Sequence, residues 1–343
     1  MFLVRVAEGL SEPYEGRALL LGPGPLEHML AEAGMPVDVE PMLGKAGILR
    51  FPRAARAWAR RLEGEGIDVI HANQAKAALF AIPLARRLGV PVLWMKHDHF
   101  FDGRLSRWLA RRCDRVAVVS RAMAAQFTGA LAERVSVVYP GVRMPPDAPP
   151  QRTGQVIAMA GRMDPLKDFG AVICATRLLR DRGLDAELAL AGTVDRVHPE
   201  HAAELDALVA RLGLDEHVTI AATDDMGGHY RRARVFVLPS PPKPGGLPSE
   251  GAPTVLMEAM GHGTAVAAAR QPGTEEVLGD VGVLVDDLSP EGWANALEPF
   301  LADPEMAERV GRQGRERAME RFSMAHTVAQ LEDLYGRMAA ERP

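Results

Sequence analysis

Short apolar runs rich in Val, Ile, Leu and Ala alternate with amphipathic stretches along the chain. This alternation is typical of strand–helix units built around parallel sheets. In the first half the runs predict strands at 18–21, 37–40, 68–71, 92–95, 116–120 and 136–139. Helices are expected between them, for example over 52–63 and 76–88. In the second half the strand-like runs are QVIAMAGR, AELALAGT, HVTIAAT, RVFVLPS, TAVAAA and VGVLV, and the helical patterns 305–322 and 324–337 follow.

The segment 141–154, GVRMPPDAPPQRTG, is rich in proline and has no apolar period, so it predicts a linker between two domains. A chain of 343 residues is long enough for two cores. We therefore expect an α/β fold of two doubly wound domains, 1–145 and 146–320, whose sheets place their carboxyl ends across a cleft.

Composition narrows the classes of protein that fit. Hydrophobic residues make up 47% and charged residues 25%, which excludes a disordered chain. No apolar run reaches the roughly 18 residues of a membrane span, and MFLVRVAEGLSEPYEG lacks the features of a signal peptide, so we expect a cytoplasmic protein. The two cysteines, Cys113 and Cys174, show neither metal-ligand spacing nor a disulfide framework.

The formal net charge of −5 argues against a nucleic-acid partner, but the charge is unevenly distributed. Residues 1–143 contain 20 basic and 14 acidic residues, a balance of +6, and the remainder has −11. An anionic ligand is therefore expected to meet the first half.

The segment 249–264, SEGAPTVLMEAMGHGT, carries the strongest chemical signal. Pro253 stands at the expected start of a helix, and Thr254 and Glu258 share one face of it. Free amides at this helix start could hold a diphosphate. They belong to Ala252, Thr254 and Val255. An amphipathic helix with a solvated glutamate near each end, Glu250 and Glu258, is the simpler alternative.

The same segment resembles the signature E-G-F-P-x-V-L-x-E-A-M-A-x-G of glycosyltransferase family 4, retaining transferases of the GT-B fold. AGRMDPLKDFG, residues 160–170, is similar to the family's G-R-x-x-x-x-K-G segment, with Asp168 in place of the usual glycine. ATDDMGGHYRRARVFVLPS, VVYPGV and PGTEEVL extend the resemblance from about Leu20 to the C-terminus. It implies two Rossmann-like domains and a last helix, 321–343, that returns to the first domain.

Carried over residue by residue, the resemblance implies that Arg162 and Lys167 bind the donor diphosphate. It implies that Glu258 binds the ribose and that Glu250 holds hydroxyls of the donor sugar. His97, in VPVLWMKHDHFFDG, aligns with a histidine that contacts the donor sugar. A surface Arg and Lys, and a structural histidine, are the alternatives.

The remaining assignments concern the nucleotide and the floor of the cleft. The loop from Thr223 to Met226 is expected to hold the base through backbone groups, and Gly192 to let the chain pass close to the donor. His71 and Asn73 resemble the family's H-x-N segment, although Asn73 could simply cap the next helix. Lys96 could add to the charge of the site.

The resemblance implies a retaining hexosyltransferase that needs no cofactor beyond its nucleotide-diphosphate-sugar donor. The sequence gives neither the sugar nor the base, and we expect a UDP-sugar. No Asp-x-Asp pair follows a strand, so metal independence is expected. The acceptor is expected to be a carbohydrate or a lipid-linked, anionic molecule, and the basic helices at 50–62 and 103–115 could touch the inner membrane face. An Arg-rich solvated face over a buried Trp is the alternative. A nucleotide-sugar 2-epimerase and a non-catalytic sugar-nucleotide binder are the rival functions.

The start of the chain departs from the family. Only 16 residues precede Arg17, where relatives have a strand, a Gly-rich loop and a helix. FLVRV could be a remnant of that strand, AEGLSEPYEG is too turn-rich for the helix, and Gly9 and Gly16 are the candidates for the loop. Either the true start lies upstream or the chain is a trimmed relative. We expect it to bind a nucleotide but to transfer sugar poorly or with relaxed acceptor choice.

Overall fold

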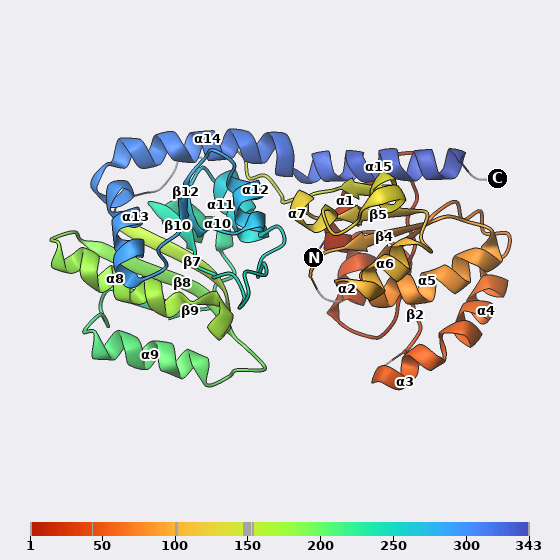
Figure 1. Cartoon of the computed structure of the whole chain (residues 1–343), viewed down its shortest axis with the longest axis horizontal. Coiled ribbons are helices and arrows are strands. Elements are labelled where there is room, and N and C mark those ends of the chain that lie inside the picture. Colours follow the sequence, from red (N-terminus) through yellow and green to blue (C-terminus); the bar gives the residue numbers. More distant parts are fainter. Residues whose placement is uncertain (1, 43, 100–101, 147–151, 153, 342–343) are drawn as a thin grey trace. The chain divides into compact units, whose positions relative to one another are not determined.

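The computed structural model describes residues 2–42, 44–99, 102–146, 152 and 154–341. It divides into two compact units, each a Rossmann-like α/β body with parallel sheets (Figure 1). Unit 1 contains Met1–Gly141 and Met324–Pro343, and unit 2 contains Val142–Ser323. Most of the second half of the predicted linker, 147–151 and 153, lies outside the described residues. No helix in the described part of the chain is long and apolar enough to span a bilayer.

The strands of unit 1 form two parallel sheets. The smaller pairs β1 (Ala18–Leu20) with β2 (Val37–Val39). The larger has the order β3-β4-β5-β6, with β3 (Ile70–Asn73), β4 (Val92–Lys96), β5 (Arg115–Val118) and β6 (Val135–Val137). Each predicted strand of this half overlaps an observed one, and no predicted boundary is more than two residues away from the observed one. β4 is buried along its whole length, which explains the unbroken apolar run that predicted it.

Helices cover these sheets. They are α1 (Phe2–Gly9), α2 (Pro25–Glu32), α3 (Gly44–Leu49), α4 (Phe51–Arg61), α5 (Ala75–Leu88), α6 (Arg104–Ala110), α7 (Arg121–Ala124), the 3-10 helix η1 (Gly129–Arg134) and α15 (Met324–Ala340). α4 buries Phe51 and Trp58 against Phe80 and Leu84 of α5. This contact forms one apolar cluster of unit 1.

The start of the chain is helical, so the prediction of a remnant strand at FLVRV is wrong. α1 contacts α2 and α15, and its residues Val4 and Val6 are buried. The Arg5 side chain donates a hydrogen bond to the Gly141 carbonyl at 3.0 Å. A lone strand needs a neighbour for its backbone groups, whereas a helix pairs them internally and here gains α15 as a packing partner. This contact also ties the C-terminal helix to unit 1, as the resemblance implied.

Unit 2 is built on one six-stranded parallel sheet of order β12-β11-β10-β7-β8-β9. Its strands are β7 (Gln155–Met163), β8 (Ala186–Val194), β9 (Val218–Ala221), β10 (Val235–Leu238), β11 (Ala265–Ala269) and β12 (Val283–Val285). The chain runs outward in one direction from β7 to β9 and in the other from β10 to β12. The order therefore reverses between β7 and β10, and ligands of such sheets bind beyond the carboxyl ends at that point.

Seven α-helices and one 3-10 helix accompany this sheet in the described part of unit 2. They are η2 (Pro165–Lys167), α8 (Phe169–Asp181), α9 (His201–Arg211), α10 (Met226–Arg232), α11 (Thr254–Gly261), α12 (Pro272–Leu278), α13 (Pro290–Ala302) and α14 (Pro304–Phe322). α8 and α13 pack together (Figure 1). Trp293 and Phe300 of α13 are fully buried. This core holds the strand ends that carry the candidate site.

Candidate active site

The candidate residues of unit 2 lie at or beyond the carboxyl ends of its strands. Arg162 is near the end of β7, Gly192 near the end of β8, and Glu250 in the segment between β10 and α11. Thr223 follows β9 and precedes α10. Residues up to 88 positions apart in sequence therefore gather at one edge of one sheet.

Arg162 is oriented by two carboxylates. Its Nη1 pairs with the Asp195 carboxylate, and its Nη2 lies 3.6 Å from Asp164 Oδ2. Asp195 also accepts hydrogen bonds from the amides of Val197 at 2.7 Å and His198 at 3.0 Å. These two amides, together with the guanidinium, hold the pKa of Asp195 below its usual value. The Arg162 side chain is 62% exposed, which leaves donors available to an anion.

Lys167 and Glu250 form an ion pair across 83 positions of sequence. Their side chains are 24% and 14% exposed. Lys167 ends the short helix η2, where Asp164 accepts a hydrogen bond from the Leu166 amide at 3.0 Å. The next residue, Asp168, has φ 48°, a left-handed conformation that explains why the family has glycine there. The turn thus aims Lys167 at the loop of Glu250.

The Glu250 loop is fastened by Gln271, a residue that the sequence analysis did not single out. Gln271 Oε1 accepts hydrogen bonds from the amides of Ser249 at 2.8 Å and Glu250 at 3.1 Å. Its Nε2 donates to the carbonyl of Ser240 at 2.9 Å, and the residue is 3% exposed. A Cβ on Gly273 would lie 2.4 Å from the carbonyl oxygen of Glu250, so α12 approaches the loop as closely as glycine allows.

α11 begins at Thr254, directly after Pro253, as the sequence predicted. The first amides of a helix have no acceptor within it, so the amides of Thr254 and Val255 stand available at the end of the helix that carries partial positive charge. Further along, Glu258 Oε2 accepts a hydrogen bond from Tyr230 at 3.0 Å. The Tyr230 ring stacks on His262 at 5.4 Å between centroids.

The loop expected to hold a base is ordered by its own polar groups. Thr223 Oγ1 accepts a hydrogen bond from the Asp225 amide at 3.1 Å, and Asp225 accepts one from the Gly228 amide at 2.7 Å. Asp225 therefore caps α10. At Gly192 a Cβ would lie 3.1 Å from the Gly161 carbonyl oxygen, so this glycine permits close packing of β7 and β8. The predicted roles of Thr223, Met226 and Gly192 toward a nucleotide stay predictions.

The remaining candidates lie in unit 1, within β3 and directly after β4. His97 Nε2 lies 2.5 Å from Asn73 Oδ1, and the Phe2 ring packs edge-on against His97 at 4.7 Å between centroids. His71 Nδ1 lies 2.6 Å from the Tyr335 hydroxyl of α15. Asn73 therefore holds His97 in place, and it does not cap α5, because Gln74 stands at that cap position.

Both histidines are neutral at pH 7. Desolvation lowers the pKa of His71 to about 3, with a further decrease from His97. Desolvation also lowers the pKa of His97 to about 4, although Asp98 opposes the shift. Because the amide oxygen of Asn73 only accepts, His97 Nε2 carries the proton and Nδ1 is the free acceptor. A neutral ring of this kind suits a sugar hydroxyl better than a phosphate.

Lys96 does not supply charge to a ligand. It is 1% exposed, lies 2.7 Å from Asp102 Oδ1 and donates to the Asp98 carbonyl at 2.5 Å. In the described part of the chain no group of three or more His, Cys, Asp and Glu side chains is placed to hold a metal ion. Cys113 is buried and burial raises the pKa of its thiol to about 12, which makes it unreactive.

Comparison with known proteins identifies the family. Residues 144–317 match the family described as glycosyl transferases group 1, and residues 13–144 match glycosyltransferase family 4. The GDP-mannose-dependent alpha-(1-6)-phosphatidylinositol monomannoside mannosyltransferase of Mycolicibacterium smegmatis is 28% identical over 84% of this chain and 81% of its own. The D-inositol 3-phosphate glycosyltransferase of Corynebacterium glutamicum is 28% identical over 97% of this chain and 83% of its own.

Solved structures agree on the fold. HepE of Anabaena, solved in complex with UDP, superimposes with a TM-score of 0.81 at 20% identity, covering 98% of this chain and 95% of its own. The sucrose-phosphate synthase of Thermosynechococcus elongatus superimposes with a TM-score of 0.72 at 20% identity, covering 95% of this chain and 100% of its own. The chain therefore belongs to the group 1 glycosyl transferases, with a first half of the family 4 type and the GT-B fold.

Proposed function

We propose that this glycosyltransferase moves a hexose, with retention of anomeric configuration, from a UDP-sugar to an anionic or lipid-linked acceptor. The observation that carries the proposal is the ion pair between Lys167 and Glu250 beside the start of α11. In this proposal Lys167 is the cation that binds the leaving diphosphate, and Glu250, beside it, is the carboxylate that accepts hydrogen bonds from sugar hydroxyls. The proposal needs no metal ion, because Arg162, Lys167 and the α11 amides supply the positive charge.

The proposed chemistry takes place on one face of the sugar. The bond between the anomeric carbon and the β-phosphate oxygen breaks, and its electron pair stays on the phosphate. The acceptor oxygen bonds the anomeric carbon from the side of departure, and its proton goes to the leaving phosphate oxygen. This step balances in atoms and charge without a nucleophile from the enzyme. The residues of the site therefore contribute by positioning the substrates and by stabilising the charge of the leaving phosphate. Glu258 holds the ribose in this scheme, and His97 accepts from a donor-sugar hydroxyl.

The names of the relatives give information on both the sugar donor and the acceptor. The mycobacterial relative uses GDP-mannose and acts on a phosphatidylinositol-linked acceptor, and the corynebacterial one acts on an inositol phosphate, so both acceptors are phosphorylated inositols. An anionic acceptor therefore has support from both names, together with the +6 balance of residues 1–143. HepE is solved with UDP, which supports a uridine donor, whereas the name of the mycobacterial relative gives a guanosine donor.

Calorimetric titration of the full chain with UDP, GDP and ADP tests the donor. We expect UDP to bind most tightly, and Lys167→Ala and Glu258→Ala to weaken it. Arg177→Ala is the matched control, because Arg177 pairs with Asp181 on its own helix α8. Absence of binding by every nucleoside diphosphate would contradict the proposal, and tighter binding of GDP would correct the base alone.

Product analysis separates the rival functions. A transferase yields a new glycoside whose anomeric configuration, read by NMR, matches that of the donor. A 2-epimerase yields an epimerised sugar nucleotide without an acceptor, and a pure binder yields neither product. Loss of activity in chelator, with recovery on adding magnesium or manganese, would contradict metal independence.

We further propose that the enzyme acts at the cytoplasmic face of the membrane and touches it through α6. The two basic helices named above differ in their tryptophans. Trp58 of α4 is 5% exposed and donates to Glu40 at 2.8 Å, so it belongs to the core. Trp108 of α6 is 39% exposed, with the Arg112 guanidinium 3.9 Å from its ring centroid. An exposed Trp among arginines suits a membrane interface.

Flotation with vesicles tests this contact. We expect recovery with phosphatidylglycerol vesicles, little with phosphatidylcholine, and weaker recovery for Trp108→Ala. Equal recovery with both vesicle types would contradict it.

A further inference from the structure

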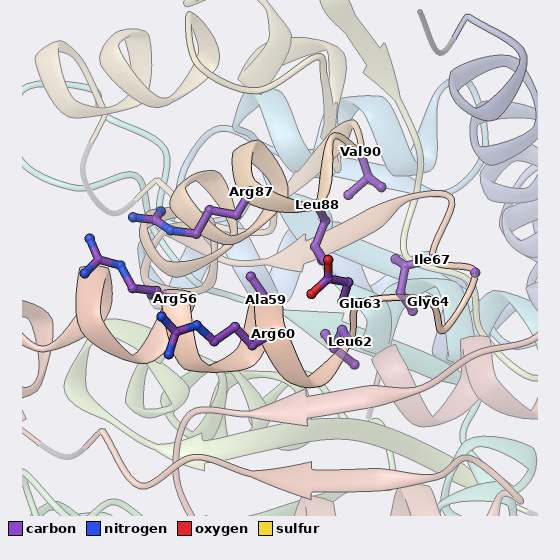
Figure 2. Close-up of a pocket in the computed structure, with 11 residues that line it drawn as sticks. Arg56, Ala59, Arg60, Leu62, Glu63, Gly64, Ile67, Arg87, Leu88 and Val90 are labelled. Atoms are coloured by element: carbon purple, nitrogen blue, oxygen red, sulfur yellow. The ribbon is translucent and has the colours of Figure 1, made fainter.

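Unit 1 contains a pocket that the proposed reaction does not use. It has a volume of about 580 Å³ and lies between α4, α5 and the loops that lead into β3 and β4 (Figure 2). Pockets of this size hold small organic ligands. The pocket thus has room for a molecule as large as a sugar phosphate.

The pocket lies at the opposite end of the sheet from His97. Gly64 and Ile67 precede β3, and Leu88 and Val90 precede β4, so they mark the amino ends of these strands. His97 follows the carboxyl end of β4. Because β4 has five residues and a strand rises about 3.3 Å per residue, the two places are roughly 15 Å apart. A ligand in this pocket would not touch His97.

Three arginines and one glutamate line the pocket. Arg56 and Arg60 stand one turn apart on α4, and Arg87 comes from α5. Figure 2 shows the three guanidinium groups toward one end of the pocket and Glu63 near its middle. The lining therefore has an excess of two positive charges, concentrated at one end.

These charges have few partners. Within the part of the chain that the structure describes, Arg56 and Arg60 make no ion pair and no side-chain hydrogen bond. Arg87 donates only to the carbonyl of Pro83, on its own helix, at 2.8 Å. All three arginines are exposed, and like charges one turn apart on a helix repel each other weakly, so a bound anion would relieve that repulsion. The neighbouring Arg61, by contrast, pairs with Asp38.

Away from the guanidinium groups, the lining is apolar apart from Glu63. Leu62 and Leu88 pack against the buried cluster formed by Trp58, Phe80 and their neighbours, and Val90 is itself buried. A ligand that fits must combine an anionic group with an uncharged body. A phosphomonoester carries about two negative charges at pH 7, which matches the excess of the lining. Guanidinium groups bind phosphate through paired hydrogen bonds.

We propose that the pocket between α4 and α5 binds a phosphomonoester, with the phosphate on Arg56, Arg60 and Arg87 and the body against Leu88 and Val90. This second anion site lies outside the donor site, and it does not depend on the transfer reaction proposed above. The phosphomonoester is either a soluble metabolite or the headgroup of a lipid such as phosphatidic acid.

Calorimetric titration of the full chain with glycerol 3-phosphate tests the site. We expect saturable binding that weakens about tenfold or more in Arg56→Gln, Arg60→Gln and Arg87→Gln, because each removes a charge-assisted contact. Arg53→Gln is the matched control, since Arg53 is exposed on α4 but does not line the pocket. Arg60→Lys keeps the charge and should recover part of the affinity.

A second arm identifies the source of the phosphate. Vesicles with phosphatidic acid present a phosphomonoester, and vesicles with phosphatidylglycerol present a diester. Stronger binding to the former than to the latter, with the excess lost in Arg60→Gln, would indicate a lipid ligand. Binding of glycerol 3-phosphate without such an excess would indicate a soluble one. Binding of neither probe, equal losses in Arg53→Gln, or losses in Lys167→Ala without losses in Arg60→Gln would overturn the proposal.

Discussion

Acid should destabilise unit 1 through His71 and His97. Both rings are enclosed by protein, which lowers the pKa of His71 to about 3 and of His97 to about 4. In the unfolded chain both pKa values return to about 6.5. The two rings are thus neutral in the folded protein at pH values where they are protonated in the unfolded chain.

The sign and size of the effect follow from proton linkage. Below pH 6.5 the unfolded state binds protons that the folded state does not, so the free energy of unfolding falls as pH falls. At pH 5 each histidine costs about 2 kcal/mol, and the pair about 4 kcal/mol, relative to neutral pH. A typical domain is stable by about 5–15 kcal/mol, so the loss is large. It begins below pH 6.5 and is complete only near pH 3.

Urea unfolding followed by tryptophan fluorescence at pH 5 and pH 7 measures this loss. Three of the four tryptophans, Trp58, Trp94 and Trp108, lie in unit 1 and report on it. His71→Gln with His97→Gln is the control, because neutral glutamines do not titrate while other groups still do. The difference between pH 5 and pH 7 should shrink by about 4 kcal/mol in the double variant. An equal difference in both proteins would refute the argument.

Three further predictions concern unit 2. Arg162→Ala and Lys167→Ala should each lower kcat about a hundredfold, as expected for a lost transition-state donor. Steady-state kinetics checks this with Arg177→Ala as control, and unchanged turnover in both variants would contradict the diphosphate role. Gly273→Ala should lower kcat at least about tenfold, because its Cβ meets the Glu250 carbonyl at 2.4 Å and displaces that loop. Gly24→Ala, where a Cβ meets nothing within 4 Å, should retain turnover in the same assay. Asp168→Gly should preserve stability or raise it by up to about 1 kcal/mol, and Asp168→Val should lower it, since φ is 48° there. Thermal unfolding compares the two variants, and equal melting temperatures would contradict the strain.

The strands of unit 2 could be predicted because their signal is local. β10 and β11 are buried at every position, so each appears in the sequence as an unbroken apolar run. The start of α11 could be predicted as well, because Pro253 marks it in the sequence. In such segments burial, propensity and turn chemistry agree, and one window of sequence carries all three.

The partners of the site residues could not be predicted in this way. Gln271 lies 21 positions beyond Glu250, and Asp195 lies 33 positions beyond Arg162. Neither sequence separation follows a helical or strand periodicity, because both pairs form where separate strands end at the same edge of a sheet. A signal for Gln271 existed: it stands directly before PGTEEVL, two residues after β11, where a polar residue at a helix start faces the same edge.

The first residues show why a local pattern can mislead. FLVRV has the β-branched and aromatic residues of a strand, yet it forms α1. The contacts that decide this come from the other end of the chain, where Val328 of α15 lies against Gly9. A strand interpretation requires a neighbouring strand, and sequence alone does not say whether the pairing or the helix contact is available.

The ion pair between Lys167 and Glu250 bears on how the proposed donor would bind. In this structure the Glu250 carboxylate pairs with Lys167, whereas Arg162 pairs with Asp195 but keeps further donors exposed. If a diphosphate binds as proposed, it must compete with Glu250 for Lys167, and it gains only the difference between the two sets of contacts. When Lys167 turns to phosphate, the Glu250 carboxylate is released beside it, and sugar hydroxyls are the donors that can satisfy it. Binding of the phosphate and binding of the sugar are then coupled through one ion pair, so a nucleoside diphosphate without its sugar leaves Glu250 unpaired and should bind less favourably than the complete donor.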